Sequence, residues 1–189
     1  MMIGTHPEFS RLVDAYMTID DLFAIRDRLI GSGRIGGKAA GMLLARRILV
    51  TDAGKTDFAE ALEAHDSFYI GSDVFYTFLV RNGMWWTRQR QRDPARFLEG
   101  AEAARQGILR GRFPEFVEQQ LGSMLDYFGQ SPFIVRSSSL LEDNFGTSFA
   151  GKYESHFCPN QDTLDENLRR LTQAIIYIYA SIFNPDALL

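Results

Sequence analysis

Three segments of the chain carry residue types that can bind an anion. The first, residues 35–41, reads IGGKAAG and places two glycines immediately before a predicted helix. Glycine lets the backbone approach a ligand closely, and the N–H groups and dipole of a helix N-terminus favour a phosphate group. Lys38 adds a mobile positive charge in the first turn. The spacing is not that of a Walker loop, and a tight turn followed by a surface lysine is the competing interpretation.

The second segment, residues 133–139 (FIVRSSS), places an arginine and three serines directly after a short apolar strand. Strand ends often carry ligand chemistry in α/β proteins. Arg136 can hold phosphate oxygens bidentately and keeps its charge at every relevant pH, while the serines add hydroxyl and backbone donors. In the competing interpretation, Arg136 pairs with Glu142 or Asp143 across a polar turn.

The third segment, residues 148–155, reads SFAGKYES. Gly151 can bring backbone N–H groups against a phosphate, and Ser155 can donate its hydroxyl. The competing interpretation is an ordinary loop that leads into a strand, with Phe149 packed in the core.

The elements that must position these segments are mostly helices. Apolar periodicity and breakers predict helices over 19–30, from just after Gly37 to Leu49, and over 57–65, 73–81, 94–109, 114–127 and 165–183. Ser72 is the predicted N-cap of the helix over 73–81. Short strands are predicted at 67–70, 133–135 and 153–157. The predicted fold class is therefore α+β, or irregular α/β.

The composition is that of an ordinary globular protein, with 46% hydrophobic and 23% charged residues. A net charge of −4 without a basic run gives no reason to expect nucleic-acid binding. Cys158 is the only cysteine, which favours a packed small hydrophobe in a reducing compartment over a catalytic thiol. The N-terminus does not resemble a signal peptide, and no apolar run approaches the roughly 20 residues that span a membrane. We therefore expect a soluble, cytoplasmic protein.

In combination, the three segments resemble one family. The chain resembles the nucleotide-binding domain of phosphoenolpyruvate synthase and pyruvate phosphate dikinase at four motifs: GGK at 36–38, VRSS at 135–138, Glu142-Asp143 and SFAG at 148–151. Rifampin phosphotransferase and the glucan water dikinases share related domains. The run from Arg136 to Ser155 is the specific part, and the resemblance covers residues 35–189. Residues 1–34 are then an N-terminal extension with a helix, within the N-terminal part of a single domain.

The resemblance implies an ATP-grasp type of fold and a kinase activity with ATP as the cofactor. It implies that Lys38 and Arg136 contact the ATP phosphates as catalytic residues, and that Gly151 and Ser155 line the same pocket. In this family a phosphoryl group of ATP typically passes to a histidine on a separate swivelling domain. Positioning and charge neutralisation do most of that work, because the phosphoryl group spreads its charge over its oxygens.

Some features depart from the family. Lys152 and Tyr153 replace two common glutamines, and Ser155 replaces a common threonine but keeps the hydroxyl. The Mg²⁺-binding acidic residue would lie beyond Leu189, and no metal ligand is assigned within the chain. None of the histidines has the sequence context of the phosphorylated residue: His6, His65 and His156. We expect part of a longer protein or a truncated relative, and no complete catalysis by these 189 residues.

The alternative function is a non-catalytic relative that acts as a regulatory or protein-interaction module. Its partner surface would combine two tryptophans with three arginines: Trp85, Trp86, Arg88, Arg90 and Arg92. The competing interpretation of this cluster is a solvated basic helix end beside a buried tryptophan. The phosphoryl acceptor stays open among pyruvate, an antibiotic, a glucan and a histidine domain.

Overall fold

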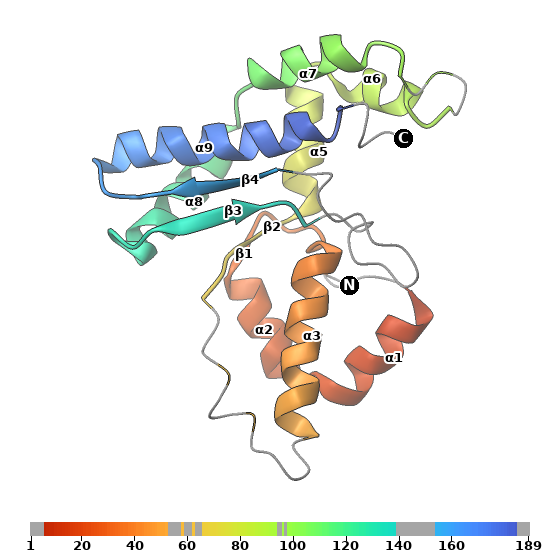
Figure 1. The fold of residues 1–189 in the computed structure, drawn as a ribbon, viewed down its shortest axis with the longest axis vertical. Helices are drawn as coiled ribbons and strands as arrows, with labels where there is room; N and C mark the ends of the chain where they lie inside the picture. The colour runs from red at the N-terminus through yellow and green to blue at the C-terminus, as the bar shows by residue number, and fades with distance from the viewer. Residues whose placement is uncertain are drawn as a thin grey trace. The chain divides into compact units, whose positions relative to one another are not determined.

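The computed structural model of the chain describes residues 6–52, 58, 62, 66–93, 96, 98–138 and 154–184. The chain forms two compact units (Figure 1). Unit 1 is Met1–Ser72 with Ser138–Phe149, and unit 2 is Asp73–Ser137 with Ala150–Leu189. Helices dominate the described residues of both units, and each unit has a small two-stranded sheet. The predicted α+β class is therefore confirmed.

The described residues of unit 1 form three helices and a short parallel strand pair. The helices are α1 (Pro7–Tyr16), α2 (Ile19–Asp27) and α3 (Gly37–Thr51), and the strands are β1 (Leu29–Ile30) and β2 (Tyr69–Ile70). α1 packs on α3, and these elements enclose a small apolar core centred on Val13, Ile25, Ile35 and Ala40.

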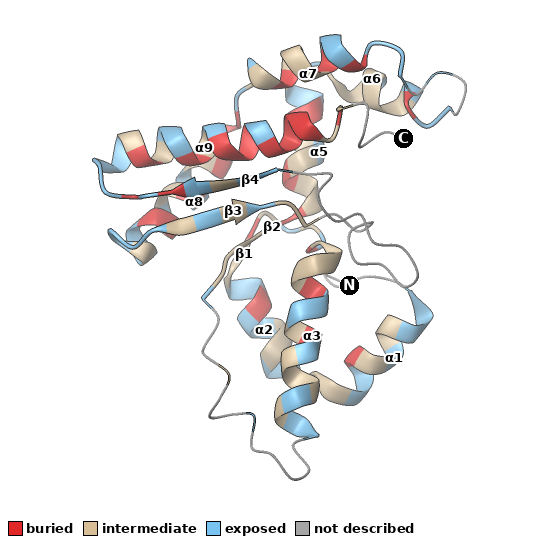
Figure 2. Ribbon diagram, viewed as in Figure 1, coloured by how far each residue is buried: buried red, intermediate tan, exposed pale blue. Residues whose placement is uncertain are grey.

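The helices of unit 2 include α5 (Ser72–Arg81), α6 (Trp85–Arg90), α7 (Ala101–Leu109), α8 (Glu115–Phe128) and α9 (Leu164–Ser181). The first residue of α5, Ser72, is assigned to unit 1. Strands β3 (Phe133–Arg136) and β4 (Ser155–Cys158) pair antiparallel. α9 is the central element, because it packs against α7, α8 and both strands. Its many buried residues are visible in Figure 2. None of the described helices combines the length and the apolar composition needed to cross a membrane.

Several predicted boundaries differ from the structure. The helix predicted over 19–30 ends at Asp27, because Leu29 and Ile30 pair with β2 instead. The helix predicted over 94–109 begins only at Ala101, after Gly100 with a φ of +69°. Ser72 does not precede α5 as a cap but is its first residue, and its hydroxyl accepts a hydrogen bond from the Arg34 N–H at 3.1 Å.

The helix predicted over 57–65 lies largely outside the described residues. Helix α1 was not predicted, although Phe9, Val13 and Tyr16 follow helical spacing and Pro7 stands in its first turn. The helices predicted over 114–127 and 165–183 are confirmed within two residues at each end, as α8 and α9.

The first turn of α9 contains a carboxylate held by two arginines. Glu166 Oε1 accepts hydrogen bonds from Arg169 Nη2 at 2.7 Å and from Arg170 Nε at 2.9 Å. The bond from Arg169, with a further contribution from Arg170, lowers the pKa of Glu166 from 4.5 to about 2. Because the folded-state pKa is lowered, the stabilisation is present above about 4.5 and is lost as the pH falls toward 2.

We therefore expect Glu166→Gln to lower the free energy of unfolding at neutral pH, and the difference from wild type to disappear as the pH approaches 2. Urea unfolding at a series of pH values measures this. Glu118→Gln is the matched control, because Glu118 also lies in the first turn of a helix and has no arginine partner among the described residues. Equal pH dependence of the two variants would contradict the role of the arginines.

Candidate functional site

The glycine–lysine segment lies at the N-terminus of α3 in unit 1. The helix begins at Gly37, with Gly36 as its N-cap in an extended conformation, and Lys38 lies in its first turn. The predicted helix start, just after Gly37, is therefore confirmed within one residue. α3 supplies the oriented N–H groups and the positive dipole end that the sequence predicted there.

Gly36 is needed because another part of the backbone lies against it. A Cβ atom built on Gly36 would collide with the main-chain carbonyl of Ser138. The φ of Gly36 is −76°, which any residue adopts, so space rather than backbone conformation requires the glycine. The sequence predicted that glycine here allows a close approach to the backbone, and the structure shows such an approach by the Ser138 main chain.

Ser138 also completes the start of α3. Its hydroxyl accepts a hydrogen bond from the Ala39 N–H at 3.0 Å, across 99 residues of sequence. Ala39 is the third residue of the helix, and the first four N–H groups of a helix have no partner within it. Ser138 therefore acts as a capping residue supplied by a distant segment, and both partners of this contact belong to unit 1.

In unit 2, Arg136 and Ser155 lie directly opposite each other. Arg136 is the last residue of β3, Ser155 is the first of β4, and the two are Cα partners in the antiparallel register. Directly opposite residues project from the same face of a sheet, and both side chains are exposed. A guanidinium and a hydroxyl donor are thus placed side by side, which is a suitable arrangement for phosphate oxygens.

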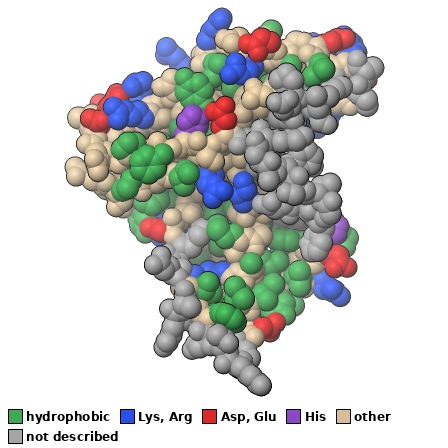
Figure 3. Space-filling model, in the orientation of Figure 1, with side chains coloured by type: hydrophobic (Ala, Val, Ile, Leu, Met, Phe, Trp, Pro, Cys, Tyr) green, Lys and Arg blue, Asp and Glu red, His purple; other side chains and the backbone are tan. Residues whose placement is uncertain are grey.

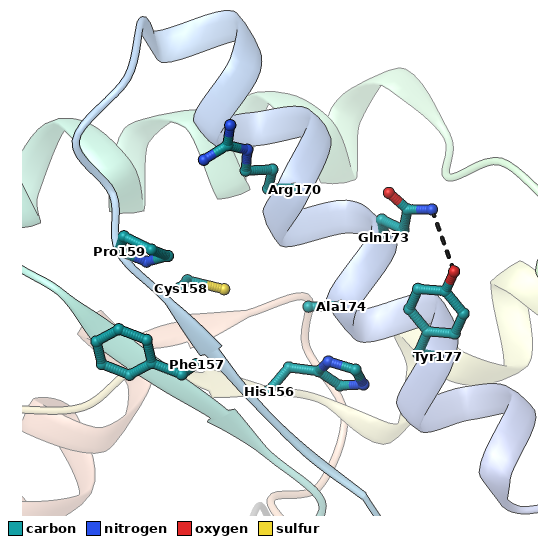
Figure 4. Close-up of a pocket in the computed structure, with 8 residues that line it drawn as sticks. All are labelled: His156, Phe157, Cys158, Pro159, Arg170, Gln173, Ala174 and Tyr177. Atoms are coloured by element: carbon teal, nitrogen blue, oxygen red, sulfur yellow. Dashed lines mark hydrogen bonds between the residues drawn. The ribbon is translucent and has the colours of Figure 1, made fainter.

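The same exposed face carries a second cross-strand pair, Ile134 and Phe157. We call the four residues Ile134, Arg136, Ser155 and Phe157 the outer face. Hydrophobic side chains gather over β3 and β4 in Figure 3. The intervening strand residues form the inner face, and Figure 4 shows His156 and Cys158 pointing toward α9 while Phe157 points away from it.

A pocket of about 200 Å³ lies on the inner face, between β4 and α9 (Figure 4). His156 stacks on Tyr177 there with ring centroids 5.4 Å apart. The arginine that lines the pocket, Arg170, is already paired with Asp162 at 2.8 Å and with Glu166 at 2.9 Å. The inner pocket is therefore a poorer phosphate site than the outer face.

Cys158 is buried in this inner region, and burial raises the pKa of its thiol. A protonated, buried thiol is a poor nucleophile, so the interpretation of Cys158 as a packed residue is supported by its surroundings. Among the described residues, no group of three or more His, Cys, Asp or Glu side chains is arranged to hold a metal ion.

The structure thus brings together two of the predicted site residues, Arg136 and Ser155, in unit 2, and places Lys38 in unit 1. Gly151 lies outside the described residues, as do Glu142 and Asp143, the alternative partners of Arg136. Within the described part of the chain, no carboxylate forms an ion pair with Arg136.

Two features of the site were not predicted from the sequence. The cap supplied by Ser138 has no local signal, because its partner is 99 residues away. The exposure of Ile134 could have been found, because residues on one face of a strand alternate and Ile134 stands two positions before Arg136.

Comparison with known proteins identifies the family of the chain. A search of curated proteins and a search of solved structures each returned no match. The family model described as "Pyruvate phosphate dikinase, AMP/ATP-binding domain" matches residues 32–189, a range that contains all three segments. Because this match covers most of the chain, the protein belongs to the family of pyruvate phosphate dikinase AMP/ATP-binding domains.

Proposed function

We propose that this chain is the ATP-binding module of an ATP-dependent phosphotransferase. Lys38 and Arg136 contact the ATP phosphates, and Gly151 and Ser155 line the same pocket. The observation that carries the proposal is the cross-strand pairing of Arg136 with Ser155 on an exposed face. The family supports the choice of ATP, since its members are described as AMP/ATP-binding domains.

In this proposal the chain binds and neutralises the phosphates. The Arg136 guanidinium donates two parallel hydrogen bonds to phosphate oxygens, and the Ser155 hydroxyl donates a third. Lys38 adds a point charge at the positive end of the α3 dipole. Such fixed charges favour phosphoryl transfer because the migrating group spreads its negative charge over its oxygens.

The remaining parts of the reaction are proposed to come from other sequence. A histidine domain or a small molecule accepts the phosphoryl group, and the Mg²⁺ ligands are expected outside these residues. Bound Mg²⁺ would neutralise phosphate charge, and no residue of this chain is assigned to it. An ATP-grasp fold for the complete domain and a cytoplasmic location complete the proposal.

Calorimetric titration of the full-length protein with ATP and Mg²⁺ tests it. We expect Lys38→Ala and Arg136→Ala each to weaken ATP binding by about 10- to 100-fold, because a hydrogen bond to a charged group contributes about 1.5–3 kcal/mol. Arg136→Lys should restore only part of the affinity, since lysine keeps the charge but loses the bidentate geometry.

Arg110→Ala is the matched control, because Arg110 is an exposed arginine of unit 2 at the end of α7. We expect it to leave the ATP affinity unchanged. An unchanged affinity in the Lys38→Ala, Arg136→Ala double variant would refute the proposed site.

The second candidate is a non-catalytic protein-interaction module, and one observation favours it. Trp86 is 71% exposed on α6, and Tyr76, Val80 and Phe116 are also exposed in unit 2. Trp85 is only half-buried, with its ring 6.0 Å from that of Tyr76. A full-length protein that fails to bind ATP, but loses a binding partner on Trp86→Ala, would favour this function.

A further inference from the structure

The outer face of β3 and β4 has an apolar half that phosphate binding does not explain. Ile134 is 55% exposed and Phe157 is 68% exposed, and the two are directly opposite each other. A sheet with one covered face normally places polar residues on the open face. Here only the Arg136–Ser155 row follows that rule, so the outer face has one apolar row and one polar row.

These two side chains contribute little to the core of unit 2. The opposite, inner face of the strands is the one that packs on α9, and Cys158 on that face is 6% exposed. Truncating Ile134 or Phe157 therefore removes little buried contact. Exposed apolar residues beside polar donors are typical of ligand sites, in which apolar surface supplies affinity and a few polar groups fix orientation.

We propose that Ile134 and Phe157 form the platform for the nucleobase of the bound nucleotide. This inference rests on the proposed function, because it takes Arg136 and Ser155 as the phosphate ligands. Residues two positions apart on a strand are separated by about 7 Å, so the apolar and polar rows are about that far apart. In a nucleotide, the ribose separates the base from the phosphates, so one molecule can cover both rows.

The chemistry of the platform also indicates how selective it is. An aromatic side chain stacks on any base, because every base has a π face. Neither Phe157 nor Ile134 has a side-chain hydrogen-bond donor or acceptor to read the edge of a base. The platform therefore increases affinity for nucleotides as a class, and truncating it weakens ATP and GTP by similar factors.

The test compares ligands with and without a base on the full-length protein. ATP, AMP and inorganic tripolyphosphate are titrated into wild type, Phe157→Ala, Ile134→Ala and Arg136→Ala. Loss of base stacking on Phe157→Ala is expected to weaken ATP and AMP by about 5- to 100-fold. Tripolyphosphate affinity should stay unchanged in this variant, which also shows that the phosphate site remains folded.

Ile134→Ala should show the same pattern with a smaller factor, because isoleucine offers area without a π face. Tyr127→Ala is the matched control, since Tyr127 is 53% exposed on α8 of the same unit. It should change none of the three affinities.

The two proposals fail in distinguishable ways. The platform is refuted if Phe157→Ala weakens ATP and tripolyphosphate equally, as expected if a protein segment covers Phe157, or if it changes neither. The phosphate site is refuted if Arg136→Ala leaves tripolyphosphate and ATP affinity unchanged. A wild-type protein that binds none of the ligands refutes both.

Discussion

Phe78→Ala should lower the free energy of unfolding by about 3–5 kcal/mol, a large part of the total stability of a typical domain. Phe78 lies on α5 and has no exposed surface. Its ring centroid is 4.8 Å from that of Phe113 and 5.6 Å from that of Tyr179. A Cβ atom added at Gly111 would collide with the Phe78 ring, so the ring also fills the space that this glycine leaves.

The loss of stability is expected near the upper end of this range, because the cavity that Phe78→Ala creates is bounded by several elements. Phe113 precedes α8, Tyr179 belongs to α9, and both side chains are buried. Burial of Tyr179 also raises the pKa of its phenol well above the ordinary value, consistent with a site closed to water. Relaxation of one helix alone would leave much of the void, and a residual cavity adds to the transfer cost.

Urea unfolding measures this prediction. Val80→Ala is the control on the same helix, because Val80 is 61% exposed and should change the free energy of unfolding by less than about 0.5 kcal/mol. A decrease in the free energy of unfolding of less than about 1 kcal/mol for Phe78→Ala would contradict the central role of the ring contacts that Phe78 makes with Phe113 and Tyr179.

Local sequence signals predict some helices and strands correctly and fail to predict others. The start of α3 beside Gly36 and Gly37 follows from glycine placement, and the extent of α9 follows from apolar spacing. By contrast, Leu29 and Ile30 continue an apolar helical pattern, but pairing with β2 makes them a strand. That pairing partner is distant in sequence, so no local propensity could have revealed it.

In the candidate site, the residues could be predicted from the sequence, but their arrangement could not. Arg136 and Ser155 were predicted as site residues from their types and from the family resemblance, and their assignment to ATP stays a proposal. Their direct opposition depends on the register of β3 with β4, which the 15 residues of 139–153 do not fix. The role of Ser138 likewise depends on a tertiary contact rather than on its neighbours.

Gly36→Ala tests this contact, and we expect it to lower the free energy of unfolding by about 1–3 kcal/mol or more. The added methyl group meets the main-chain carbonyl of Ser138, which cannot rotate away as a side chain can. Ser138→Ala should cost only about 1 kcal/mol, because it removes the cap at Ala39 but leaves the carbonyl in place.

Gly41→Ala is the matched control, since it adds the same methyl group to the same helix where nothing lies within 4 Å. It should raise the free energy of unfolding by up to about 1 kcal/mol through helix propensity. Ser138→Ala should not rescue Gly36→Ala, because the collision is with the backbone; rescue would show that the Ser138 hydroxyl is the obstacle. If Gly36→Ala proved as stable as Gly41→Ala, the close approach itself would be refuted. Under the proposed function, Gly36→Ala also displaces the first turn that carries Lys38, so its ATP affinity should fall together with its stability.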